Sequence, residues 1–253
     1  MKNCGFGWEN RVLQGQLNAS AQSDSLPVLN LTNLQGSSSF AWRIPSTTAT
    51  LTIACSSQVS WQAFSVHRTN LSASAVLNVS VQAAGQTVWS QSTTGALLGQ
   101  ILLIAPDPVQ GDTAVLSVSD PENPDGFLSV PLAYAGPLFQ PARNFSSSSA
   151  SGRTLGQTTL TALSGAEFIE ARWVQRHLQI VHQSLGDADL AALDPMIASA
   201  GLDQNVLFVP DPSAAAMTLN RAALYGRLSA GDLSNPFGAA DRHSQTFTFT
   251  ERL

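Results

Sequence analysis

The chain has 253 residues, enough for two ordinary domains or one large β-domain, and hydrophobic residues make up 43% of it. Charged residues contribute only 11%, which excludes the highly charged, weakly hydrophobic composition of a disordered chain. The net charge of −5, without any basic cluster, argues against binding to nucleic-acid phosphates. No apolar stretch approaches the roughly 20 residues that span a bilayer, so no membrane insertion is predicted.

The amino terminus carries Lys2 but no apolar run behind it, so no signal peptide is predicted. Cys4 and Cys55 form no C-x-x-C unit and are too few for a zinc cage. They could pair if the amino terminus lies beside the strand expected at 51–54. Nothing marks the chain as secreted, which favours the reduced form.

The first half has the pattern of strands throughout, with apolar residues alternating along short β-branched runs. A turn at Ala84-Gly85 and an acidic turn at 120–126 separate successive runs. Short strands at this spacing predict a β-sandwich or jelly roll over residues 1–144. The expected strands lie at 47–54, 61–66, 76–81, 86–89, 100–104, 114–118 and 127–130.

The composition changes after residue 144, where a run of serines leads to Gly152. Small residues of this kind predict an exposed, flexible linker or loop over 145–157. If the segment contacts a neighbouring molecule, its candidate assembly residues are Ser146, Ser147, Ser148 and Gly152.

Residues 158–253 predict a smaller β-rich domain, a barrel or sandwich, which would serve in assembly. Its helical period near 188–200 follows Asp187, a suitable N-cap, and Pro195 favours a kinked helix or two short turns. The expected strands lie at 158–163, 167–173, 176–182, 205–209, 221–228 and 246–250.

Charge is distributed unevenly between the halves. No Asp or Glu occurs from Ser25 to Pro106, and fifteen of the seventeen acids lie from Asp107 onward. A neutral, hydroxyl-rich surface suits packing against neighbours or hydrogen bonding to a sugar. A poorly charged exposed sheet explains the pattern equally well.

Catalytic and cofactor-binding motifs are missing from the sequence. There is no H-E-x-x-H, G-x-S-x-G, G-x-G-x-x-G or Walker pattern. His177 and His182 are five residues apart, and Glu167 and Glu170 are three apart, so each pair would lie on opposite faces of a strand. The sequence therefore predicts a protein that is not an enzyme and needs no cofactor.

The acidic turn offers oxygen ligands for a structural calcium ion, from Asp120, Asn123 and Asp125. It lacks the EF-hand spacing, and two prolines stiffen it. A plain Asx-type turn is the simpler interpretation.

Three tryptophans of the neutral half, Trp42, Trp61 and Trp89, are candidates for a platform on which a sugar could stack. Aromatic residues within strands more often belong to the core. The two interpretations differ in whether the three rings are exposed on one face or buried.

Several segments carry a family resemblance, notably Val66-His-Arg-Thr-Asn-Leu71, Tyr134–Asn144 with its Gly-Pro step, and the closing Phe-Thr-Phe-Thr-Glu-Arg-Leu. In chain order they are similar to tail-tip or baseplate structural proteins of long-tailed, siphovirus-like bacteriophages. The first half looks like the galactose-binding-like jelly roll of those proteins. The resemblance transfers no catalytic residue.

The resemblance implies a non-enzymatic structural protein of the virion tail tip, made in the host bacterial cytoplasm. Its partners would be copies of itself and hub, tail-tube and fibre proteins. The alternative hypothesis is a carbohydrate-binding module that recognises a cell-surface glycan. The two can coexist in one chain.

Overall fold

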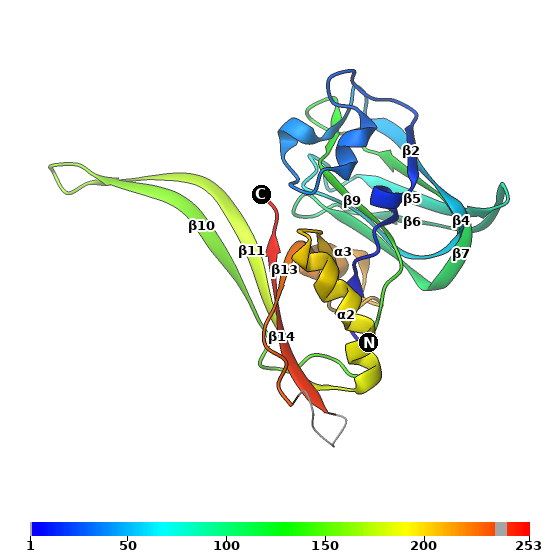
Figure 1. Cartoon of the computed structure of the whole chain (residues 1–253). Coiled ribbons are helices and arrows are strands. Elements are labelled where there is room, and N and C mark those ends of the chain that lie inside the picture. Colours follow the sequence, from blue (N-terminus) through cyan, green and yellow to red (C-terminus); the bar gives the residue numbers. More distant parts are fainter. Residues whose placement is uncertain (1, 236–241) are drawn as a thin grey trace.

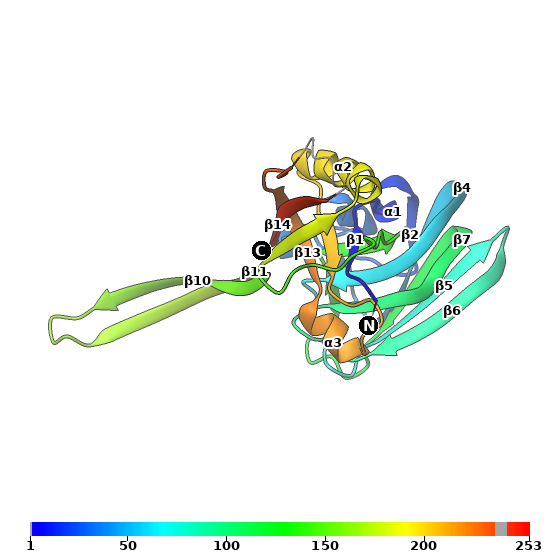
Figure 2. The same cartoon turned by 90° about the horizontal axis from the view of Figure 1, so that it is seen from below.

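The computed structural model describes residues 2–235 and 242–253. It consists of a jelly roll built mainly from the first half and an antiparallel sheet built mainly from the second, from which a long β-hairpin projects (Figure 1, Figure 2). The predicted fold class, mainly β with a jelly-roll amino-terminal half, is confirmed.

In the jelly roll the main sheet has the order β2-β4-β7-β5-β6, with β9 paired to β4, and β3 and β8 form a separate two-stranded sheet. Three short helical segments cover one end. The elements are α1 (Arg11–Gln14), β2 (Gln16–Ala19), η1 (Val28–Thr32), η2 (Ser38–Phe40), β3 (Trp42–Ile44), β4 (Thr48–His67), β5 (Val76–Ala83), β6 (Gln86–Thr94), β7 (Ile101–Ser119), β8 (Leu128–Val130) and β9 (Leu132–Gly136).

The alternation read from the sequence places one face of this sheet in the core. Leu77, Val79 and Val81 of β5 are buried, whereas the residues between them are exposed or half-buried. β4 and β7 are much longer than expected, and their register shifts between Ala54 and Val59 and again between Trp61 and Ala63.

The second sheet has the order β1-β12-β13-β14-β11-β10 and is open, ending at β1 on one side and β10 on the other. Its core is aromatic, with Phe6 in contact with Phe208, Phe247 and Phe249. The elements are β1 (Gly5–Gly7), β10 (Ala150–Thr161), β11 (Glu167–Leu185), α2 (Asp187–Gly201), β12 (Val206–Val209), α3 (Ala216–Ala222), β13 (Leu224–Ala230) and β14 (His243–Glu251).

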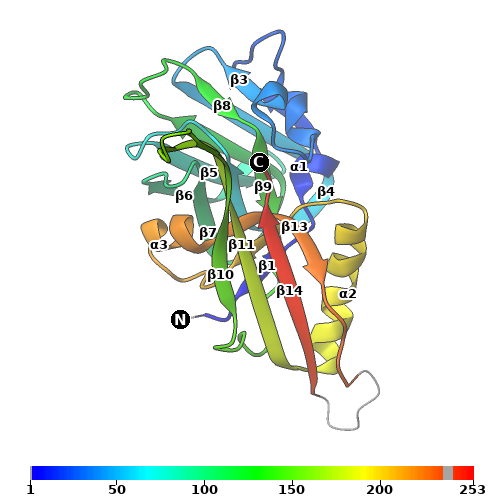
Figure 3. The same ribbon diagram turned by 90° about the vertical axis from the view of Figure 1, so that its left-hand side faces the viewer.

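The predicted helix is present as α2, which packs beside β13 (Figure 3). It runs through Pro195 without a break, where two short turns were one expectation. Leu193 and Met196 on either side of the proline are fully buried against the sheet, and this packing holds the helix in place. No helix within the described residues is long and apolar enough to cross a membrane.

The flexible linker or loop predicted at 145–157 is a loop only as far as Ser149, and from Ala150 onward the prediction is wrong. The Ser146 amide donates to the Val181 carbonyl (2.7 Å), and the Val181 amide donates to Ser149 Oγ (2.9 Å), which fixes the serine turn against β11. β10 begins at Ala150, so Gly152 is a strand residue opposite His177. The serine and glycine composition of this segment indicated flexibility. Composition contains no information on the long-range hydrogen bonds that fix the segment.

A single boundary after residue 144 does not describe the chain either. β1 pairs with β12, so the chain starts in the second sheet, passes through the jelly roll and returns. Buried hydrogen bonds join the two bodies, including those from Asn10 Nδ2 to Tyr225 Oη (3.0 Å) and to the Ala133 carbonyl (2.8 Å). The two halves therefore share one folded unit.

Candidate functional site

The most prominent surface feature is a β-hairpin arm, here residues 153–176. Pairing of β11 with β14 reaches only His177, opposite Thr250. Beyond that point β10 and β11 continue as a two-stranded ribbon that projects away from both bodies (Figure 1, Figure 2). Every residue from 157 to 174 is exposed. The turn at the tip closes at Gly165, where φ is +82°.

Both faces of the arm carry large apolar side chains. Cross-strand partners lie on the same face of the ribbon. Side chains of β10 alternate between the two faces without interruption, because the extra residue at the register shift near Gly156 belongs to β11. Six large apolar side chains, three on each face, are between 42% and 66% exposed. One face carries Leu155, Ile169 and Val174, and the other carries Leu160, Phe168 and Trp173.

The edges of the arm are also open. Within the described part of the chain β10 pairs only with β11, and β11 has no second neighbour before His177. An isolated two-stranded ribbon is at best marginally stable in water, and open apolar edges favour pairing with other chains. The arm therefore exposes apolar side chains and unpaired strand edges in one segment.

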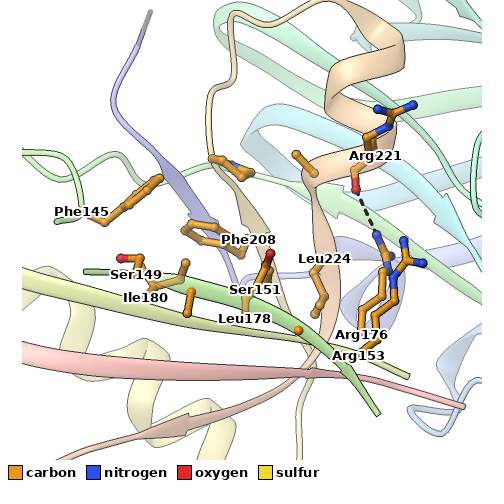
Figure 4. A pocket seen from close by; sticks show the side chains of 14 residues that line it. Phe145, Ser149, Ser151, Arg153, Arg176, Leu178, Ile180, Phe208, Arg221 and Leu224 are labelled. Atoms are coloured by element: carbon orange, nitrogen blue, oxygen red, sulfur yellow. Dashed lines mark hydrogen bonds between the residues drawn. The ribbon is translucent and has the colours of Figure 1, made fainter. Parts of the chain in front are cut away.

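At the base of the arm lies a groove of about 510 Å³ (Figure 4). Phe145, Ile180 and Phe208 form an apolar end, whereas Arg153 and Arg221 stand at the opposite end. The strands of the arm form one wall, since Arg153 comes from β10 and Ile180 from β11. The groove is thus apolar at one end and basic at the other.

The arginines of this basic end differ in their pairing. Arg176 is bound to Glu251 through Nη2–Oε1 (2.7 Å) and Nε–Oε1 (3.0 Å), and both side chains are largely buried. Among the described residues, neither Arg153 nor Arg221 pairs with a carboxylate. Two guanidinium groups at the groove are therefore available to a negatively charged partner.

Arg176 also connects the root of the arm to the jelly roll. Its Nη2 donates to Gln100 Oε1 (3.3 Å), and Gln100 Nε2 donates to the Ala223 carbonyl (3.0 Å). His67 Nδ1 lies 2.8 Å from the same Oε1, so the imidazole donates from Nδ1 and accepts at Nε2 from Ser65 Oγ (2.8 Å). Burial lowers the pKa of His67 to about 3. This network holds the base of the arm in a defined orientation.

The tryptophan platform is not formed as predicted. Trp42 is 1% and Trp61 0% exposed, and their indole N–H groups donate to the carbonyls of Ala21 and Gly111 (3.0 Å each). Trp89 is half-buried and stacks on Phe64 at 5.8 Å. Trp42 and Trp61 pack within the hydrophobic core of the jelly roll, so neither offers a face to a sugar.

The acidic turn is closed by its own hydrogen bonds. Asp120 is fully buried, and its oxygens accept from the Ser72 amide (2.7 Å), Ser72 Oγ (2.6 Å) and Asn123 Nδ2 (2.9 Å). Asp125 Oδ2 accepts from Asn70 Nδ2 (2.8 Å). Burial raises the pKa of Asp120, but the hydrogen bonds from Ser72 and Asn123 outweigh it and lower the pKa. The carboxylate oxygens serve protein donors, so the turn does not fit the predicted calcium site, and the described residues hold no cluster of metal-ligating side chains.

The proposed assembly residues lie beside the arm rather than at its tip. Ser149, next to Ser146, Ser147 and Ser148 in the turn before β10, lines the groove together with Gly152. The sequence indicated the arm itself only as two strands. The sequence signal for the arm is the two runs on either side of Ser164-Gly165, in which apolar residues fall on both faces. A strand at the surface of a sheet normally has one apolar face.

The jelly roll offers a second, neutral groove of about 490 Å³ along β5, β6 and β7. Ser117, Asn78 and Ser92 stand in register across the three strands, and Ser80 pairs with Ser90 in the next row. Hydroxyl and amide groups therefore line one continuous face without a charged side chain among the lining residues.

The chain matches no known family model and no curated protein sequence. About half of the chain is similar in fold to nearly the whole of several solved structures. A fucose-binding module from Streptococcus pneumoniae is 8% identical (TM-score 0.41) and covers 51% of this chain and 98% of its own. The lectin domain of lectinolysin complexed with Lewis B antigen is 13% identical (TM-score 0.42), and the match covers 53% of this chain and 98% of that domain. A family 32 carbohydrate-binding module from Streptococcus pneumoniae EndoD is 12% identical (TM-score 0.42), and the match covers 50% of this chain and 98% of that module.

Proposed function

We propose that this chain is a non-enzymatic subunit of a larger protein assembly, which it joins through the arm. The observation that carries the proposal is a projecting ribbon that is apolar on both faces and open at both edges. A monomer that exposed this ribbon permanently would be prone to aggregate. A partner that covers the ribbon buries its apolar area and forms backbone hydrogen bonds with its edges.

The specific assembly we propose is the tail tip or baseplate of a long-tailed bacteriophage, with location in the virion and hub, tail-tube and fibre proteins as neighbours. The support is the resemblance of the segments at 66–71 and 134–144 and of the closing residues. The buried network at the arm's root adds to it, because a subunit that docks by an arm needs that arm at a defined angle.

The test is to remove the arm and leave the fold intact. Residues 155–174 are replaced by an Asn-Gly turn, which joins the paired residues Thr154 and Gln175. The shortened chain is expected to remain a folded, soluble protein but to be missing from purified particles. Particles that contain it at the normal level would overturn the proposal, as would the absence of the full-length chain from particles.

Glycan binding by the jelly roll is a second candidate, supported by the neutral groove over β5, β6 and β7. Hydroxyl and amide groups in register are suited to hydrogen bonding with a neutral sugar, although no exposed tryptophan completes the site. The test is a glycan array with the wild-type chain and an Asn78→Ala/Ser92→Ala variant. We expect signals that the variant loses, and an array without signal at high protein concentration removes this candidate.

A further inference from the structure

The groove at the base of the arm and the tip of the arm are complementary in chemistry. We propose that the groove of one molecule receives the arm tip of a second copy of this chain. The inference rests on the proposed function, because it names the first partner of the arm.

The groove supplies apolar area at one end and unpaired positive charge at the other. Phe145 and Phe208 contact each other edge-to-face at 6.0 Å and shape the apolar end. Arg153 and Arg221 provide the charge, since the third arginine is neutralised by Glu251. A suitable occupant therefore presents large apolar side chains next to carboxylates.

The tip of the arm has this composition. From residue 154 to 171 the only charged side chains are Glu167 and Glu170. Glu167 has no ion-pair partner among the described residues, and the contact of Glu170 with Arg172 (3.1 Å) is exposed and therefore weak. Phe168 and Ile169 lie between the two glutamates on opposite faces of the ribbon. Either face thus combines an apolar side chain with a carboxylate.

A molecule cannot fill its own groove. From Arg153 to Thr161 the strand extends roughly 26 Å at about 3.3 Å per residue, directed away from the body (Figure 1, Figure 2). Each copy therefore offers both an arm and a groove to other copies. Such a head-to-tail contact closes into a ring or continues as a filament, whereas a reciprocal exchange gives a two-fold dimer.

The first experiment is a charge exchange followed by analytical ultracentrifugation over a range of concentrations. We expect wild-type chain to self-associate, and either Glu167→Arg/Glu170→Arg or Arg153→Glu/Arg221→Glu to weaken association about tenfold or more. A mixture of the two variants is expected to recover it, because each contributes the surface that suits the other. All four positions carry long surface side chains, and circular dichroism confirms that the variants fold.

The second experiment locates the contact by disulfide trapping in a Cys55→Ser background. Ser164→Cys at the tip and Ser151→Cys at the groove are too far apart to pair within one chain, so oxidation should give covalent multimers. The matched control is Ser164→Cys with Ser57→Cys, an exposed position in β4 of the jelly roll, and it should stay monomeric.

The outcomes separate this inference from the proposed function. The groove is not the site for the arm if the wild-type chain is monomeric at all concentrations. The same conclusion follows if both charge variants associate as strongly as the wild-type chain. If such a chain still needs its arm to enter particles, the assembly role stands with a different partner. If the shortened chain enters particles normally, both conclusions fail.

Discussion

At the scale of single residues, His67 shows how burial sets a chemical property. Its pKa is lowered from 6.5 to about 3 mainly because the charged imidazole would lose its hydration. The unfolded chain therefore binds a proton between about pH 6.5 and 3 that the folded chain does not bind. The stability contributed by this group is complete above pH 6.5 and is lost as the pH falls through this window.

We predict that the free energy of unfolding falls as the pH is lowered from 7 to 4, with a share on the order of several kcal/mol from His67. His67→Gln should be less stable at pH 7 but should lose less on acidification, as measured by urea unfolding at each pH. Parallel curves for the two proteins would contradict the assignment.

The tryptophans give a second contrast at this scale. Trp61→Ala removes a fully buried ring and should cost about 3–5 kcal/mol of unfolding free energy. Trp173→Ala, on the exposed arm, should change it by less than about 0.5 kcal/mol. Urea titration of both variants tests this difference, and equal losses would mean that the arm is packed in the free chain.

At the scale of elements, the arm is only partly predictable from local sequence patterns. Its strands were predicted only in part, at 158–163 and 167–173, whereas the helix near 188–200 was predicted as a whole. The strand from Ala150 to 157 was missed because serine and glycine occur both in flexible loops and in exposed strands. Which residues of a hairpin are left uncovered depends on where β14 stops, and no local signal in residues 150–176 reports that.

The arm should be the first part of the free chain to be cut by trypsin. Arg172 lies on the ribbon with its side chain 59% exposed, whereas Arg176 at the root is 13% exposed and paired with Glu251. We expect cleavage after Arg172 well before cleavage after Arg176, detected by mass spectrometry. In the assembled state the Arg172 site should be protected, and equal cleavage in both states would show that the arm stays uncovered.

At the scale of the whole molecule, the chain crosses between its two bodies more than once and joins them through buried polar contacts. Arg176 belongs to both, since it binds Glu251 of β14 and Gln100 before β7. The jelly roll and the second sheet should therefore unfold together in one calorimetric transition.

Arg176→Ala should lower the free energy of unfolding by about 3 kcal/mol, because it leaves the largely buried Glu251 without its partner. The matched control Arg172→Ala removes an exposed pair and should cost less than about 1 kcal/mol. Calorimetry of both variants tests this, and two separate transitions in wild-type protein would contradict the coupling of the bodies.

The mainly β class, the jelly-roll character of the first half and the position of the helix follow from local sequence patterns, because periodicity and turn residues act locally. The burial of Trp42 and Trp61, the internal hydrogen bonds of the Asp120 oxygens, and the free ribbon, apolar on both faces, beside a basic groove become apparent only in the folded chain. Each of these depends on contacts between residues far apart in the chain, for which composition and spacing carry no signal.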